Sequence, residues 1–163
     1  MKILGIDPGT ATVGWGMIEA KSGKPKAIAY GHIATDKSLP IQTRLQEIRD
    51  DLTTILKRYQ PDRVAVESLF FFKNQKTVIT VAEARGVILL TLADFGISIA
   101  EYTPLQVKQS LTNYGRAEKQ QMQLMTQKLL GLKSIPKPDD AADALAIALC
   151  DLARYKQESL LKG

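Results

Sequence analysis

The chain has 163 residues, of which 45% are hydrophobic and 24% charged, and its formal net charge is +5. These proportions are typical of a globular protein, and no apolar run reaches the ~20 residues that a bilayer-spanning helix needs. The N-terminus has none of the features of a signal peptide, so we expect a cytoplasmic protein. A single cysteine, Cys150, excludes an intrachain disulfide, and a single histidine excludes a His/Cys zinc site.

The first stretch is a short apolar run, residues 2–6, that ends at Asp7 and is followed by Pro8-Gly9-Thr10. This pattern predicts a buried strand and then a turn. Residues 11–19 and 26–34 flank a polar turn, which predicts two more strands in an antiparallel start to the fold. Asp7 either begins the turn by accepting backbone hydrogen bonds or emerges at the strand end as a site residue, and this stretch leaves both readings open.

Further along, apolar residues at helical spacing predict an amphipathic helix over residues 40–59, which Pro61 ends. Residues 63–67 have the pattern of a buried parallel strand reached by a helical crossover, and this strand ends in Glu67. A helix over 77–94, a strand over 97–102 and helices over 105–112, 117–130 and 139–155 follow. We therefore expect an α/β fold with a mixed five-stranded sheet flanked by helices, forming one domain over 1–155 before a flexible tail at 156–163.

The predicted helix over 77–94 is apolar on more than one face. One stripe is expected to face the sheet, and it comprises Val78, Val81, Ala82, Leu89 and Leu92. Ile79, Ile88 and Leu90 lie off this stripe, and a surface helix of a small domain needs only one. These additional apolar residues predict a homodimer through this helix, with Ile88 facing the partner, because two-fold pairing is the commonest way to cover an exposed apolar face. The alternative is a monomer in which later helices cover it.

Four acids are expected to meet at one edge of the sheet. Asp7 and Glu67 both end strands that we expect to be parallel neighbours, and sites in open α/β sheets form at this edge. Asp140 and Asp143 are three residues apart on the last helix, so they share a face, and the alanines around them let that face approach the sheet. Acids in a first helical turn also complement the helix dipole, which explains Asp139 and Asp140 better than Asp143.

Such a cluster favours metal-dependent phosphoryl chemistry. Four close carboxylates repel one another unless a cation joins them, and oxygen-only ligation suits Mg²⁺ or Mn²⁺ rather than zinc. Two such ions ~4 Å apart stabilise the attacking and leaving oxygens of a phosphoryl displacement. Paired carboxylates can also serve a glycosidase, but the basic surface favours a phosphate substrate.

A loop at residues 68–76 contains the triplet Phe70-Phe71-Phe72, followed by Lys73 and Lys76. Stacking of a base on an aromatic side chain contributes ~1–3 kcal/mol, so the triplet suggests a nucleic-acid contact. Further cations that could contact phosphates are Arg85, Lys108, Arg116 and Lys119. The alternative is that the rings fold into the core and the cations are ordinary solvated surface.

Six motifs along the chain resemble the RuvC family of bacterial crossover (Holliday) junction endodeoxyribonucleases. In order they are Gly5-Ile6-Asp7-Pro8-Gly9-Thr10, Val66-Glu67, Ala82-Glu83-Ala84-Arg85-Gly86, Gln106-Val107-Lys108-Gln109, Ala117-Glu118-Lys119 and Asp140-Ala141-Ala142-Asp143-Ala144-Leu145-Ala146. The resemblance implies a ribonuclease-H-like fold and metal ligands at Asp7, Glu67, Asp140 and Asp143. Asp139 competes with Asp140 by spacing, but the Asp-Ala-Ala-Asp motif favours Asp140.

The resemblance also implies a DNA-stacking ring at Phe70 and DNA-binding lysines at Lys108 and Lys119. Because Phe71 and Phe72 depart from the family pattern, the stacking ring is left open. The implied activity is a structure-selective endonuclease that resolves Holliday junctions by paired Mg²⁺-dependent cuts in recombination and repair. It would act as a homodimer, alongside the RuvA–RuvB branch-migration complex.

Two other functions remain possible at the level of sequence. The turn Asp7-Pro8-Gly9-Thr10 also occurs in ATPases and kinases of the actin-like superfold, although these need two lobes and this chain has room for one. A nucleic-acid-binding module without catalysis is the other alternative, but clustered acids weaken DNA binding unless metals offset them.

Overall fold

The computed structural model describes residues 1–21, 24–68 and 78–161, and it contains one five-stranded mixed sheet in the order β3-β2-β1-β4-β5. The strands are β1 (Lys2–Asp7), β2 (Thr12–Lys21), β3 (Lys24–Ala34), β4 (Arg63–Glu67) and β5 (Ser98–Tyr102). The first three pair antiparallel, whereas β4 runs parallel to both β1 and β5. The predicted mixed five-stranded sheet is therefore confirmed.

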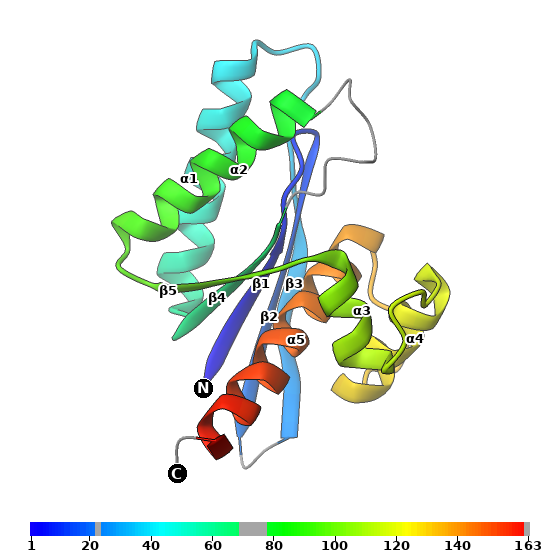
Figure 1. The fold of residues 1–163 in the computed structure, drawn as a ribbon. Coiled ribbons are helices and arrows are strands. Elements are labelled where there is room, and N and C mark those ends of the chain that lie inside the picture. The colour runs from blue at the N-terminus through cyan, green and yellow to red at the C-terminus, as the bar shows by residue number, and fades with distance from the viewer. Residues whose placement is uncertain (22–23, 69–77, 162–163) are drawn as a thin grey trace.

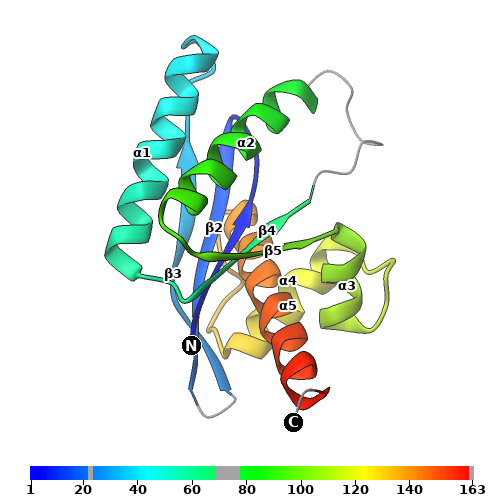
Figure 2. The same ribbon diagram turned by 60° about the vertical axis from the view of Figure 1, so that its left-hand side comes forward.

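Helices cover both faces of the sheet. On one side lie α1 (Ile41–Tyr59) and α2 (Val78–Asp94), and on the other α3 (Pro104–Thr112), α4 (Lys119–Leu130) and α5 (Asp139–Leu161) (Figure 1). Successive side chains of β1 point to opposite faces of the sheet, so the core has two parts. Leu4 and Ile6 pack with α1 and α2, whereas Ile3 packs with α5. The view in Figure 2 shows α5 lying along the sheet on its second face. Among the described residues, no helix is long and apolar enough to cross a membrane.

The predicted element boundaries agree with the structure to within two residues, except at the end of α5. We expected this helix to end at residue 155 and a flexible tail to follow, but α5 continues to Leu161. The predicted helix end at residue 155 is therefore wrong, and the expected flexibility of the tail stays a prediction. Residues 156–161 include no glycine or proline to stop the helix, so it propagates by its backbone hydrogen bonds although its side chains are exposed there.

The predicted core face of α2 is right for Leu92 and wrong for Ile88. The buried residues are Ala84, Ile88, Thr91 and Leu92. Ile88 is 0% exposed and packs against the sheet rather than facing outward, whereas Ile79 and Leu90 are 71% and 64% exposed. A helix that is apolar on several faces has overlapping stripes of similar hydrophobicity, so its sequence pattern does not show which stripe packs against the sheet.

Candidate active site

Asp7 and Glu67 lie side by side at the carboxyl ends of β1 and β4. The parallel register pairs Ile6 with Val66, so the next residue of each strand reaches the same edge of the sheet. Burial of Ile3, Leu4 and Ile6 on β1 and of Val64 to Val66 on β4 fixes both strands in the core. The predicted juxtaposition of these two acids is confirmed by the register.

The N-terminal turns of α5 bring two more acids to this edge because the helix touches the sheet directly. A Cβ placed on Gly5 would lie 1.9 Å from the carbonyl oxygen of Ala144, and one on Gly14 would lie 2.1 Å from that of Asp140. Glycine is therefore required at both positions for this close approach. The alanines of α5 were expected to allow the contact, but the matching glycines on β1 and β2 were not recognised from the sequence.

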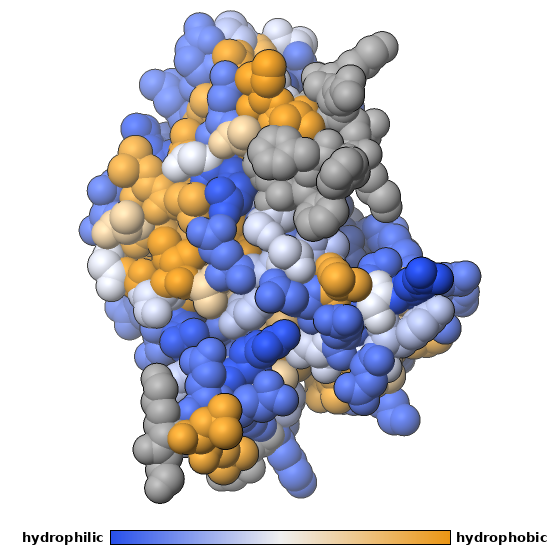
Figure 3. Space-filling model, in the orientation of Figure 1, coloured by the Kyte–Doolittle hydropathy of each residue, from blue (hydrophilic) through white to orange (hydrophobic). Residues whose placement is uncertain are grey.

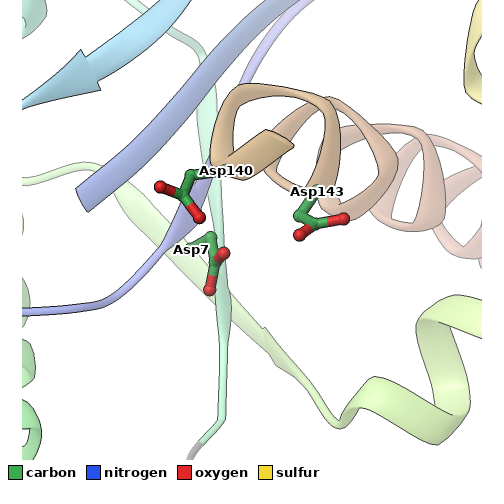
Figure 4. A group of neighbouring side chains, drawn as sticks. All are labelled: Asp7, Asp140 and Asp143. Atoms are coloured by element: carbon green, nitrogen blue, oxygen red, sulfur yellow. The ribbon is translucent and has the colours of Figure 1, made fainter. Parts of the chain in front are cut away.

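Three carboxylates converge at the start of α5. Asp7, Asp140 and Asp143 each offer an oxygen, and these oxygens all lie within 4.8 Å of one another. Figure 4 shows the side chains approaching from the end of β1 and the first turns of α5. Glu67 is outside this close set, but it lines the same pocket of about 210 Å³ as Asp7 and Asp143.

The protonation of the acids reflects this crowding. Burial raises the pKa of Asp7 to about 8, and the charges of Glu67, Asp143 and Asp140 act in the same direction. Burial and Asp143 raise the pKa of Glu67 to about 7, although Lys108 opposes the shift. The pKa of Asp143 is raised by burial and held back by Lys119. A divalent cation would remove this repulsion, and an all-carboxylate donor set fits a hard cation such as Mg²⁺ or Mn²⁺.

Basic side chains line the rim of the acidic pocket. Lys119 Nζ lies 3.4 Å from a carboxylate oxygen of Asp143 and 3.4 Å from one of Asp139. Burial alone would lower the pKa of Lys119, but these two carboxylates raise it. Asp139 also accepts a hydrogen bond from Lys137 Nζ at 3.0 Å. Asp139 thus pairs with lysines and is not a member of the carboxylate cluster, which agrees with the expectation that Asp140 is the better ligand.

A buried ion pair fixes α5 to the sheet. Asp151 is 0% exposed, and it accepts hydrogen bonds from Arg63 Nε at 2.9 Å and Nη2 at 3.0 Å. The hydroxyl of Tyr102 donates to the same carboxylate at 2.8 Å. Arg63 begins β4 and Tyr102 ends β5, so this carboxylate holds the helix that carries Asp140 and Asp143 against the neighbouring strands. This ion pair was not predicted, although Asp151 is a single acid directly after the apolar run 144–150 and could have indicated a buried partner.

The remaining predicted DNA contacts lie in different settings. Lys108 lines the acidic pocket, and Arg116 is exposed in the turn between α3 and α4. Arg85 does not line the pocket; it forms an ion pair with Glu101 on β5. The residues Phe70, Lys73 and Lys76, together with Phe71 and Phe72, lie outside the described residues.

Comparisons with known proteins agree on one family. The family described as "Crossover junction endodeoxyribonuclease RuvC" matches residues 3–151. The RuvC of Syntrophomonas wolfei is 57% identical over 163 residues, which cover 100% of this chain and 95% of that protein. The structure of Thermus thermophilus RuvC is 34% identical with a TM-score of 0.89, and the match covers 97% of each chain.

A second Thermus thermophilus structure contains RuvC in complex with a Holliday junction substrate. It is 32% identical to this chain, with a TM-score of 0.87 and 96% of each chain covered. These likenesses confirm the predicted ribonuclease-H-like fold, and nothing in them supports an ATPase or kinase of the actin-like superfold. The chain therefore belongs to the RuvC family of crossover junction endodeoxyribonucleases.

Proposed function

We propose that this chain resolves Holliday junctions by metal-dependent cleavage, with Asp7, Glu67, Asp140 and Asp143 as the metal-binding and catalytic residues. The observation that carries the proposal is the cluster of half-buried carboxylates at the carboxyl edge of the sheet in a member of the RuvC family. The solved structure of Thermus thermophilus RuvC in complex with a Holliday junction substrate supports a four-way junction as the DNA partner.

The metal proposed for this site is Mg²⁺, in up to two ions per site, with Mn²⁺ as the alternative. Asp7, Asp140 and Asp143 would hold it through their close oxygens, and Glu67 would join them from the adjacent strand. When bound, such ions supply a nucleophilic water and neutralise the charge that develops on the leaving oxygen. The raised pKa of Asp7 supports the proposal, because a carboxylate that is costly to ionise alone is stabilised beside a cation.

The chain's own cations would hold the phosphodiester at the pocket. Lys108 and Lys119 line it together with Asp7 and Glu67, so a phosphate that enters the pocket meets positive charge beside the acids. Arg116 would meet the DNA further along the same side. Phe70, Lys73, Lys76 and Arg85 remain predicted DNA contacts.

We further propose that the chain acts as a homodimer through α2. Figure 3 shows hydrophobic residues gathered on the surface over this helix, and Ile79, Leu90 and Phe95 are exposed there. A Holliday junction is resolved by two cuts in opposing strands, so two sites related by a two-fold axis match the symmetry of the substrate. The family resemblance alone suggests the RuvA–RuvB branch-migration complex as a further partner.

The function is tested by incubating the protein with an end-labelled four-way junction and with a linear duplex of the same arm sequence, each with Mg²⁺ or with EDTA. We expect paired cuts in the junction only when Mg²⁺ is present, and no cuts in the linear duplex. Cleavage of both DNAs, or cleavage in EDTA, would contradict the proposal. ATP hydrolysis without cleavage would instead support the actin-like alternative, and binding without cleavage would support a silent binding module.

A further inference from the structure

A second pocket lies beside the turn that follows Asp7. Its volume is about 460 Å³, and it is lined by residues from four segments of the chain, one of which is Thr80 and Val81 of α2. Thr10 and Thr12 come from the turn after β1, Lys37 from the connection between β3 and α1, and Arg44 from the first turn of α1. No carboxylate is found among the described residues that line it, so the pocket carries net positive charge.

The guanidinium of Arg44 is held in place by a short hydrogen-bond chain. Arg44 Nε donates to Thr35 Oγ1 at 2.9 Å, and the Thr35 hydroxyl donates to the backbone carbonyl of Thr10 at 2.6 Å. This chain uses one N–H of the guanidinium, and the described residues give Arg44 no ion pair. The nearby acid Asp36 does not line the pocket and accepts from the backbone amide of Ser38 at 2.8 Å. An arginine fixed in this way can donate its remaining N–H groups to two oxygens of one phosphate.

Thr10 adds an independent sign of a ligand. It is only 7% exposed, yet its hydroxyl has no hydrogen-bond partner among the described residues. Buried hydroxyl groups almost always have a partner, and an exception calls for a specific explanation. Thr10 lines the pocket together with Arg44 and Lys37, so an anion bound there would lie beside this hydroxyl and could accept its hydrogen bond.

We propose that this pocket binds one backbone phosphate of the DNA strand, a few nucleotides from the cleaved bond. The inference rests on the proposed junction cleavage. Thr10 follows Asp7 by three residues, so their Cα atoms are at most ~11 Å apart, and one strand of B-DNA rises ~3.4 Å per nucleotide. A phosphate in the pocket would therefore fix the register of the strand relative to the acids, because phosphate contacts position DNA without reading its sequence.

Single phosphates on the cleaved strand can be replaced by neutral methylphosphonates, one position at a time, within five nucleotides of the cut. Junction binding is then measured in EDTA for the wild type and for Arg44→Gln. We expect one position at which the replacement weakens wild-type binding more than it weakens binding by Arg44→Gln, because the variant has already lost part of that contact. Equal losses in both proteins at every position would overturn the proposal.

Salt dependence gives a second readout that does not require intact hydrogen bonding around Arg44. Lys37→Gln, which leaves the Arg44–Thr35 contact in place, should lower the slope of log K against log salt by about 0.9. Between 50 and 200 mM salt, this difference is about a threefold change in relative affinity. Lys57→Gln, at an exposed lysine in the last turn of α1, is the matched control and should leave the slope unchanged.

The two variants also separate this inference from the proposed function. If wild-type protein fails to bind the junction, the proposed function fails. If the wild type binds and cleaves but Lys37→Gln and Lys57→Gln have the wild-type slope, only the phosphate pocket is refuted. Thr10→Val removes the unpartnered hydroxyl without a change of charge, so it should weaken binding at an unchanged slope; full wild-type affinity would remove Thr10 from the site.

Discussion

Replacing Asp7 with asparagine should stabilise the metal-free protein at neutral pH. Burial raises the pKa of this carboxyl from 3.8 to about 8, so the folded chain holds a proton that the unfolded chain releases. The free energy of unfolding must therefore fall as pH rises from about 4 to about 8, which is the reverse of the usual behaviour of a paired acid. Glu67, with its pKa raised to about 7, contributes in the same direction.

The size of the effect follows from the same shift. At pH 7, about three pH units above the ordinary Asp value, holding the proton costs up to ~4 kcal/mol at ~1.4 kcal/mol per unit. Water reaches this half-buried group and relaxation lowers the cost, so we expect a gain of ~1–3 kcal/mol for Asp7→Asn. In a chain of this size, that gain corresponds to a rise in Tm of roughly 2–10 °C.

Thermal and urea denaturation in EDTA at pH 5 and pH 8 measure this effect. The gain for Asp7→Asn should be larger at pH 8 than at pH 5, and Mg²⁺ should raise the Tm of the wild type more than that of the variant. Asp139→Asn is the matched control, because the lysines beside Asp139 lower its pKa and its loss should not stabilise the protein. If Asp7→Asn destabilises the protein equally at both pH values, the reasoning from burial and repulsion is refuted.

Further changes probe the Asp151 ion pair, the contact of α5 with the sheet and the proposed dimer. Asp151→Asn leaves the partly exposed guanidinium of Arg63 without its counter-charge and should lower the free energy of unfolding by ~1–3 kcal/mol in urea titrations; a loss under ~0.5 kcal/mol would contradict this. Gly14→Ala places a methyl group against the Asp140 carbonyl and should displace the start of α5. Single-turnover cleavage should then fall at least tenfold while junction binding persists. Normal cleavage would show that α5 can move away from the sheet without loss of the site. Leu90→Glu should give the 18.0 kDa monomer in sedimentation equilibrium with the fold intact. A charge at the buried Ile88 should instead unfold the chain. A dimer that persists in Leu90→Glu would place the interface elsewhere.

Local patterns were enough to predict the elements and the edge at which the acids meet. The strand Arg63–Glu67 was predicted with its observed bounds because a proline precedes the apolar run and a carboxylate ends it. Asp7 and Glu67 were placed together because two parallel strands end at the same edge. Element ends that a proline or a charge marks, and a helix that connects two buried strands, are readable from a single sequence.

Apart from the end of α5, the missed features depend on partners that are distant in the chain. The ion pair of Arg85 with Glu101 was not predicted, because nothing near Arg85 in the sequence indicates that Glu101 lies opposite. Asp151 meets Arg63 across 88 residues, and Gly14 is needed only because α5 arrives above it. The orientation of α2 failed for the same reason, since the sheet and α1 together select which of its apolar faces is buried.

The central claim is that four acids, and not their neighbour Asp139, form the metal site that cuts the junction. It is tested most directly by single-turnover junction cleavage in Mg²⁺ by Asp7→Asn, Glu67→Gln, Asp140→Asn, Asp143→Asn and Asp139→Asn, with junction binding measured in parallel. We predict that the first four variants bind the junction but cleave it at least ~100-fold more slowly, and that Asp139→Asn retains substantial activity. An inactive Asp139→Asn beside an active Asp140→Asn, or near-normal cleavage by any of the first four, would contradict the account.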